Sequence, residues 1–201
     1  MTTSHSIPSA LDRRSAVARL LRDRGTALVV SSLGNPTYDV AASGDSPFNF
    51  YLWGAMGGAI AFGLGLAVAQ PSRRVMVFAG DGEMMMGIGS LATVAVHGAD
   101  NLSVVVIDNE HYAETGMQPA HAGRGVNISA VAQAVGFKFA RTVRSEQELE
   151  QAADTVLHQP GPVLVTIKVS TRPSPTVLPP RDGPYLRSRF RDALLGAIAH
   201  Q

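Results

Sequence analysis

The chain has 201 residues, which is ample for one hydrophobic core and short for two domains. A net charge of +1, with 16% charged residues, argues against nucleic-acid binding, and the absence of cysteine excludes disulfides and thiolate zinc sites. The first ten residues lack the pattern of a signal peptide, and the longest apolar run, 54–69, is too short for a membrane span. We therefore expect a cytoplasmic protein with neither nucleic-acid nor membrane partners.

The first fifty residues contain one clear helix and one clear strand. Residues 1–10 show no periodicity, and we expect a mobile N-terminal arm there. Apolar residues recur at helical spacing over 11–24, which predicts an amphipathic helix that ends at Gly25. A short buried strand follows over 27–31, and prolines and glycine without any period predict a loop over 36–50.

The next stretch, 49–66, is rich in glycine and alanine. Ala55, Ala59, Gly63 and Ala67 lie four residues apart, so they form a ridge of small side chains on one side of a helix. Such a ridge lets another backbone approach closely, which predicts a tightly packed core helix.

The centre of the chain is predicted to form one unit of strand, turn, helix and strand. A buried strand over 74–79, a glycine turn at 80–82, a helix over 83–97 and a second buried strand over 102–107 follow one another. Both strands end in polar residues, the first at Asp81 and the second at Asn109. In a parallel sheet the carboxyl ends of such strands line the crevice in which ligands bind.

These residue types suit a metal–diphosphate site. Gly80 and Gly82 permit a sharp turn and a close approach of the backbone to a ligand. Asp81 supplies an anionic oxygen and Asn109 a neutral carbonyl oxygen, and Mg²⁺ prefers oxygen ligands that phosphate and water complete. The alternative is a ligand-free α/β turn in which Asp81 caps the following helix.

The spacing of these residues resembles a known signature. Twenty-five residues, 83–107, separate Gly80-Asp81-Gly82 from the pair Asp108-Asn109. The pattern resembles the thiamine diphosphate enzymes, in which the GDG motif precedes a pair of asparagines by some two dozen residues. Here Asp108 replaces the first asparagine, while the second, Asn109, is intact.

The resemblance implies a set of binding residues. It implies that magnesium is bound by the side chains of Asp81 and Asn109 and by the backbone carbonyl of His111. The cofactor-binding residues that it implies are Gly54, Met56, Gly80, Asp81, Gly82, Glu83, Asn109 and His111.

A second block, Gly54-Ala55-Met56-Gly57, also resembles the family. By this resemblance Met56 wedges beneath the cofactor and holds its two rings in a V, while the carbonyl of Gly54 accepts a hydrogen bond from the pyrimidine amino group. Met56 lies 25 positions before Asp81, which suits that role. Methionine used simply as core filler is the alternative.

The loop after Asn109 contains the candidates for contact with a substrate, namely Glu114, Thr115, Gln118 and His121. His121 is the candidate catalytic residue, because imidazole exchanges protons near neutral pH. For each residue singly, the alternative is a solvated loop side chain.

The remainder of the chain continues the alternation. We expect a helix over 130–135 capped by Asn127 or Ser129, a strand over 137–143, a capped helix over 145–158, a strand over 163–169, a proline-rich arm over 170–184 and a helix over 185–199. Alternating strands and helices predict an α/β fold with a three-layer, doubly wound parallel sheet. We interpret 11–169 as a thiamine diphosphate-binding PP (diphosphate-binding) domain and 170–201 as an extension.

Within the family the chain looks most like the β subunit of sulfopyruvate decarboxylase and the C-terminal half of phosphonopyruvate decarboxylase. The resemblance implies a thiamine diphosphate- and Mg²⁺-dependent lyase that decarboxylates a small 2-oxo acid, with the cofactor as electron sink. It also implies a separate pyrimidine-binding, α-type subunit that carries the activating glutamate, in a hetero-oligomer with at least two copies of each chain. A carboligase or oxidoreductase subunit, or a non-catalytic binding partner, are the alternatives.

Overall fold

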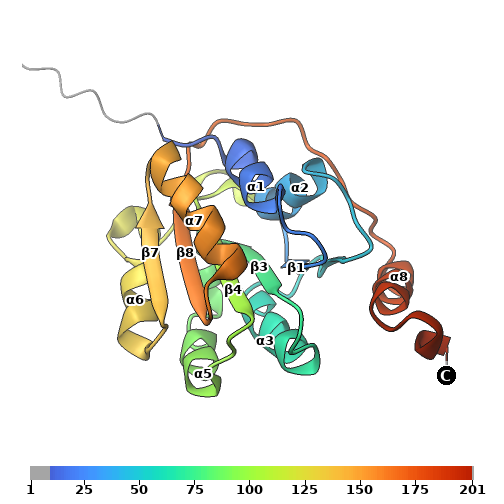
Figure 1. Ribbon diagram of the computed structural model, residues 1–201. Helices are drawn as coiled ribbons and strands as arrows, with labels where there is room; N and C mark the ends of the chain where they lie inside the picture. The colour runs from blue at the N-terminus through green and yellow to red at the C-terminus, as the bar shows by residue number, and fades with distance from the viewer. Residues whose placement is uncertain (1–9, 201) are drawn as a thin grey trace, which may run out of the picture.

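The computed structural model describes residues 10–200, which form one parallel sheet between two layers of helices (Figure 1). The six strands lie in the order β2-β1-β3-β4-β8-β7, and every neighbouring pair is parallel. Their bounds are β1 Leu28–Ser31, β2 Asn49–Tyr51, β3 Val75–Gly80, β4 Leu102–Asp108, β7 Phe139–Val143 and β8 Val163–Lys168. The predicted three-layer, doubly wound α/β fold is confirmed.

The helices divide between the two faces of the sheet. On one face lie α1 (Arg13–Leu21), α2 (Asn35–Ala42) and α7 (Glu146–His158), and on the other lie α3 (Ala59–Ala69), α5 (Ser90–His97) and α6 (Ile128–Val135). The short helix α4 (Asp81–Met86) follows β3 directly. A small hairpin of β5 (His111–Tyr112) and β6 (Gln118–Pro119) lies outside the main sheet, with the 3-10 helices η1 (Ala113–Thr115) and η2 (Ala122–Arg124) near it in sequence.

Two hydrophobic clusters hold the layers together. Along β3, Met76 and Phe78 pack into the cluster beneath α1, α2 and α7, while Val75 and Val77 pack into the cluster above α3 and α5. This alternation follows from the pleat, which points successive side chains to opposite faces. Because both faces are covered, the central strands are apolar throughout, as parallel strands must be.

The helix ends follow the capping residues that the sequence predicts. The Asn127 side chain accepts a hydrogen bond from the Ala130 amide at 3.0 Å, and Gly136 ends α6 in a left-handed conformation. At the start of α7, the Ser145 hydroxyl accepts from the Glu148 amide, and the Glu148 carboxylate accepts from the Arg144 amide at 2.6 Å. The helices predicted over 130–135 and 145–158 are therefore confirmed.

Three expectations about the elements are wrong. The predicted loop over 36–50 contains α2 and β2, and Pro36 sits in the first turn of α2, where a missing amide costs nothing. The predicted single helix over 83–97 is broken between Met86 and Ser90, where the backbone of Gly87 lies against Gly57. The small-residue helix begins at Ala59, so Ala55 precedes it.

The break between α4 and α5 has a steric cause. The backbone of Gly87 lies against Gly57, and a Cβ atom on Gly87 would clash with the Gly57 carbonyl oxygen. A continuous helix could not bring these two chain segments so close. Glycine at positions 57 and 87 therefore allows the two backbones to touch, and the helix is interrupted at this contact.

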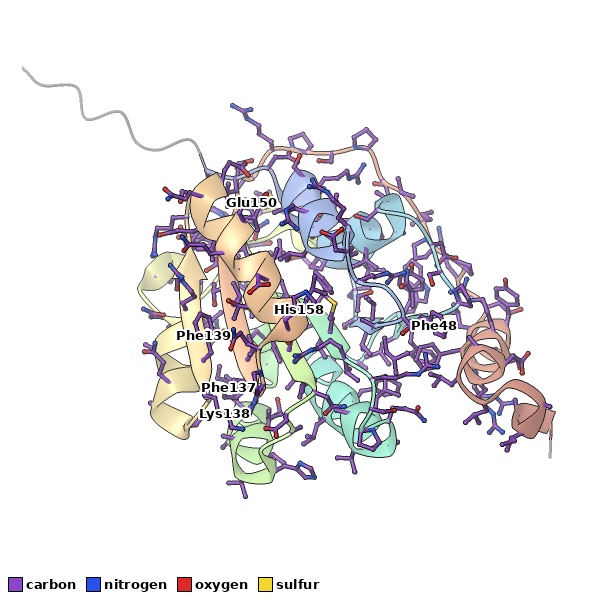
Figure 2. All side chains as sticks on the ribbon, viewed as in Figure 1. Phe48, Phe137, Lys138, Phe139, Glu150 and His158 are labelled. Atoms are coloured by element: carbon purple, nitrogen blue, oxygen red, sulfur yellow. The ribbon has the colours of Figure 1, made fainter. Side chains whose placement is uncertain are left out.

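The C-terminal helix α8 (Gly183–Leu195) covers the β2 edge of the sheet, and the 3-10 helix η3 (Gly196–His200) follows it (Figure 1). Its Leu186 joins one hydrophobic cluster and its Phe190 the other, so α8 caps both layers at this edge. On the face of α7, Glu150, labelled in Figure 2, pairs with Arg19 of α1 at 2.6 Å.

The structure bears only partly on the expected N-terminal arm and on the expected absence of a membrane span. The expected arm over 1–10 lies, except for Ala10, outside the described residues. Within residues 10–200, no helix is long and apolar enough to cross a membrane.

Candidate active site

The candidate site lies at the carboxyl ends of β1 and β3, where the strand order reverses. From β1 the chain moves outward to β2 and then returns to the other side of β1 to form β3. At such a switch point the loops that follow the two strands diverge and leave a crevice. The residues that line the cavity there are Arg13, Leu33, Gly34, Asn35, Pro36, Met56, Gly80, Asp81, Gly82, Glu83, Ile107, Asn109, His111, Tyr112, Ala113, Glu114 and Thr115.

Asp81 begins α4 at the floor of this cavity. Its side chain is only 2% exposed, and among the described residues its Oδ2 atom has no hydrogen-bond partner. Burial, and next the charge of Asp108, raise the pKa of Asp81 to about 7. A buried carboxylate oxygen without a donor is costly, and a bound cation would satisfy it.

Asn109 and His111 face the same cavity from the end of β4. The Asn109 side-chain oxygen accepts a hydrogen bond from the His111 amide at 3.0 Å, and the His111 ring nitrogen Nδ1 lies 2.8 Å from the Asn109 carbonyl oxygen. These contacts close a tight turn that brings the side chain of residue 109 and the backbone of residue 111 to one place. The structure thus brings together the three predicted metal-binding residues.

Asp108 serves this turn rather than the cavity itself. It is 3% exposed, it accepts a hydrogen bond from the Glu110 amide at 3.0 Å, and its other oxygen pairs with Lys168 at 2.9 Å. Lys168 is its neighbour across the β4–β8 ladder and also pairs with Glu110. The residue that departs from the asparagine pair therefore has a counter-ion and a structural task.

Glu83 is the second buried acid of the cavity. Its side chain is 5% exposed, and its carboxyl group lies near the Ser32 hydroxyl and the backbone of Gly57 and Gly80, whose hydrogen bonds oppose the effect of burial on its pKa. Burial raises the pKa of Glu83 to about 7. The cavity therefore holds two buried carboxyl groups, of which Asp81 has an oxygen without a partner among the described residues, and such a lining suits a ligand with cationic or hydrogen-donating groups.

The loop 53–57, which we call the cofactor loop, forms another wall. Met56 lies on the cavity and is 42% exposed, so it is not core filler. Gly54 does not line the cavity, but its carbonyl accepts a hydrogen bond from the Ser32 hydroxyl at 2.7 Å, which leaves a second lone pair for another donor. Gly80 and Gly82 line the cavity with Asp81, as expected from the turn.

Of the four candidate substrate-contacting residues in the loop after Asn109, two line the cavity and two do not. Glu114 and Thr115 line the cavity, whereas His121 and Gln118 are exposed and do not. His121 approaches the site only through the Tyr112 hydroxyl, 3.4 Å from its Nδ1 atom. Gln118 hydrogen-bonds Thr115, with 2.8 Å from its amide nitrogen to the Thr115 carbonyl oxygen. The catalytic role of His121 therefore stays a prediction, with a position at the rim.

Sequence reasoning missed one wall of the cavity. Residues 33–36 follow β1 and line the cavity, although the sequence pattern there indicates only a turn. Arg13 lies in the predicted amphipathic helix, yet it is 4% exposed, lines the cavity and bonds the buried Asp39. The signal that could have found the wall is the glycine–proline turn directly after a buried strand.

The cavity fits the metal–diphosphate group in its chemistry. The donor set is one orphaned carboxylate, one side-chain amide and backbone groups, which is the oxygen-rich and incomplete shell that Mg²⁺ shares with phosphate and water. Between residues 10 and 200 no three His, Cys, Asp or Glu side chains form a metal-binding group, so a self-sufficient protein cage is absent from this part of the chain. The fold and the site together are those expected of an α/β domain that binds a diphosphate cofactor at its switch point.

Comparison with known proteins specifies the family. Residues 34–167 match the family described as thiamine pyrophosphate enzyme, C-terminal TPP binding domain, and the chain belongs to it. Sulfopyruvate decarboxylase subunit beta of Methanothermobacter thermautotrophicus is 39% identical, over 75% of this chain and 82% of that protein. Phosphonopyruvate decarboxylase of Streptomyces viridochromogenes is 38% identical over 80% of this chain but only 39% of its own length. The predicted resemblance to these decarboxylases is confirmed.

Solved structures agree with the fold. The 4-hydroxybenzoylformate decarboxylase of Rhodococcus jostii RHA1 superposes with a TM-score of 0.69 at 18% identity, over 87% of this chain and 35% of that one. Benzoylformate decarboxylase from Polynucleobacter necessarius gives a TM-score of 0.66 at 18% identity, over 85% and 36% of the two chains. This chain therefore has the fold of about one third of such an enzyme.

Proposed function

We propose that this chain is the diphosphate-binding, β-type subunit of a thiamine diphosphate- and Mg²⁺-dependent decarboxylase that acts on a small 2-oxo acid bearing a second anionic group. The single observation that carries the proposal is the orphaned Asp81 oxygen, buried in the same cavity as Asn109 and His111. The relatives of comparable length are named as beta subunits of sulfopyruvate decarboxylase, which supports a partner subunit. The cytoplasm stays the expected location.

The residues of this chain have distinct tasks in the reaction. Bound thiamine diphosphate supplies the electron sink for loss of carbon dioxide. Asp81 and Asn109, with the carbonyl of His111, hold Mg²⁺ and so orient the diphosphate. Gly80 and Gly82 allow the backbone to approach it, and Met56 excludes water and supports the rings from one side.

The partner subunit completes the site. The activating glutamate of this enzyme class belongs to the pyrimidine-binding domain, and the matched family region covers only the TPP-binding domain. We propose a hetero-oligomer of at least two copies of each chain with cofactors at the heterologous contacts. Acetolactate synthase isozyme 1 of Escherichia coli, a large subunit, is 25% identical over 58% of this chain, so a carboligase is less well supported.

The test is reconstitution. This chain, tagged and purified from its native cells together with its bound partner, is supplied with thiamine diphosphate and Mg²⁺ and assayed for carbon dioxide release from sulfopyruvate, phosphonopyruvate and pyruvate. We expect release that needs both cofactors and is abolished by Asp81→Ala. Condensed products without net release of an aldehyde would favour the carboligase instead.

A further inference from the structure

The cofactor loop has a backbone that its own residues do not favour. Trp53 and Ala55 have φ angles of 52° and 44°, and Gly54 between them has a φ of 152°. Left-handed φ values are uncommon for residues other than glycine, and such conformations persist only where the surroundings hold them. The strained residues directly precede Met56, so whatever holds them also places the wedge.

Contacts from Ser32, the residue directly after β1, account for part of this restraint. The Trp53 amide donates to the Ser32 carbonyl at 3.0 Å, and the Ser32 hydroxyl donates to the Gly54 carbonyl at 2.7 Å. Ser32 is fully buried, so it is a fixed support. These contacts restrain the backbone of the loop from inside the fold, but they do not touch the Trp53 ring.

The ring is held from outside by the C-terminal segment 170–182. The indole Nε1–H of Trp53 donates to the Pro180 carbonyl at 2.7 Å, and the Arg181 guanidinium lies 5.7 Å from the centre of the ring. The hydrogen bond between the Trp53 indole and the Pro180 carbonyl thus joins segment 170–182 to the cofactor loop.

The segment is itself anchored at several points. The Ser170 amide donates to the Leu11 carbonyl at 2.8 Å, and Arg14 donates to the Pro175 carbonyl at 2.6 Å. Figure 1 shows the segment running from β8 past α1 and α2 to α8. There the buried Leu186 and Phe190 fix α8 on the sheet edge. A segment held at both ends can hold a third element between them.

We infer that Trp53 is a positioning residue, and that segment 170–182 holds the cofactor loop in its binding conformation through the indole–Pro180 hydrogen bond. The bond acts through the backbone on the Gly54 carbonyl and on Met56, and Trp53 itself is not in the cavity lining. The role of this loop in cofactor binding rests on the proposed function, whereas the hydrogen bond that restrains the loop lies within this chain.

The experiment uses the fact that Trp53 is the one tryptophan of the chain. Expression in a tryptophan auxotroph with β-(3-benzothienyl)alanine replaces the indole N–H by sulfur at residue 53 and nowhere else. Hydrogen exchange of the Trp53 and Gly58 amides, which donate to the Ser32 and Ala55 carbonyls, is then followed in the full chain without cofactor. We expect about five-fold faster exchange there, as the loss of one hydrogen bond predicts. The control Leu178→Ala, an exposed residue of the segment, leaves exchange unchanged.

In the assembled enzyme the same replacement should lower kcat about five-fold while the Kd for thiamine diphosphate changes less than two-fold, since the diphosphate anchor is intact. Trp53→Phe, which also lacks the donor, serves as the second variant if the analogue is poorly incorporated, and it should give the same exchange result. Unchanged exchange of the Trp53 and Gly58 amides in both variants overturns the inference. Failure of the proposed function would appear separately, as wild-type enzyme without cofactor-dependent turnover but with the exchange difference intact.

Discussion

Asp81 is the residue on which the chemistry of the site depends most. It is placed at the first position of α4, almost completely buried, with one oxygen lacking any described partner. Burying that oxygen without a partner costs free energy, and a bound cation would recover it, which is why we propose Asp81 as a metal ligand.

Replacing Asp81 by alanine tests this arrangement. Asp81→Ala removes the anionic metal ligand, and we expect Mg²⁺-dependent affinity for thiamine diphosphate to fall by roughly 100-fold, because a charge-assisted contact contributes about 2–3 kcal/mol. Isothermal calorimetry on the assembled enzyme measures it. Asp100→Ala, which removes an exposed carboxylate that pairs with Lys138, is the control and should bind normally. Equal affinities of Asp81→Ala and wild type would contradict the metal assignment.

Met56 gives a second prediction at the scale of one side chain. Met56→Ala leaves the diphosphate site intact but removes the support beneath the cofactor rings. We expect kcat to fall roughly 10- to 100-fold with a much smaller change in cofactor Kd, because misplacement of reacting groups acts on turnover. Steady-state kinetics at saturating cofactor, with calorimetry, separates the two. A loss of affinity with normal turnover per bound cofactor would rule out the wedge.

Helix α3 shows how a whole element depends on its smallest residues. Gly63 is buried against β3, and a Cβ atom there would clash with the Cγ2 atom of Val77, whereas Gly65 two residues later has open space around it. The small-residue ridge of Ala59, Gly63 and Ala67 therefore works as predicted, by allowing the helix to lie close to the sheet.

The two glycines make a matched pair for a stability measurement. Gly63→Ala should destabilise the chain by about 1–3 kcal/mol, because a stiff β-branched valine in a packed core cannot yield easily. Gly65→Ala should stabilise it by about 0.5–1 kcal/mol, since alanine favours the helix and meets nothing. Urea denaturation of the full chain gives both values. Similar effects of the two substitutions would show that the ridge does not control the packing.

The attachment of α8 to the sheet edge gives a prediction about pH. Arg189 of α8 donates to Asp45, 2.6 Å from its Oδ2 atom, and the Tyr51 hydroxyl also donates to Asp45 at 2.9 Å. Burial alone would raise the pKa of Asp45, but these hydrogen bonds and the Arg189 charge together hold it below its ordinary value of 3.8. A carboxyl group whose pKa is lower in the folded state than in the unfolded state stabilises the fold at pH values above its unfolded-state pKa. This stabilisation is lost as the pH falls through its folded-state pKa.

Asp45→Asn should therefore cost about 1 kcal/mol at pH 7, a modest figure because the carboxylate is partly exposed to screening solvent. The difference from wild type should shrink as the pH is lowered from about 4 toward 2. Urea denaturation at a series of pH values measures it. A difference that stays constant over this range, or grows at low pH, would mean that the pair does not stabilise the charged form.

At the scale of the whole molecule, the sequence predicts the local turns, strand ends and capped helices, but it predicts only some of the residues that line the cavity. The GDG turn, the Asp108-Asn109 strand end and the capped helices depend on neighbours in sequence, and each formed where expected. The α4–α5 break depends on Gly57, some thirty residues upstream, so helical spacing could not show it. The wall at 33–36 depends on the reversal of strand order between β1 and β3, which no local pattern contains.

The whole-molecule claim is that this chain supplies half of an active site. The proposed diphosphate and metal residues lie in one domain, while the related phosphonopyruvate decarboxylase, at 38% identity, is more than twice the matched length. Met56 and Glu114 line the cavity and are exposed. A second subunit that carries the activating glutamate would close it.

The most direct measurement is carbon dioxide release from a panel of 2-oxo acids by the isolated chain, saturated with thiamine diphosphate and Mg²⁺, compared with the same chain combined with its purified partner. We expect the isolated chain, alone or as a homo-oligomer, to bind cofactor without turnover, and we expect turnover when the partner is added. Robust turnover by the isolated chain would contradict it and would direct attention to Glu83, the buried carboxyl group within the same cavity.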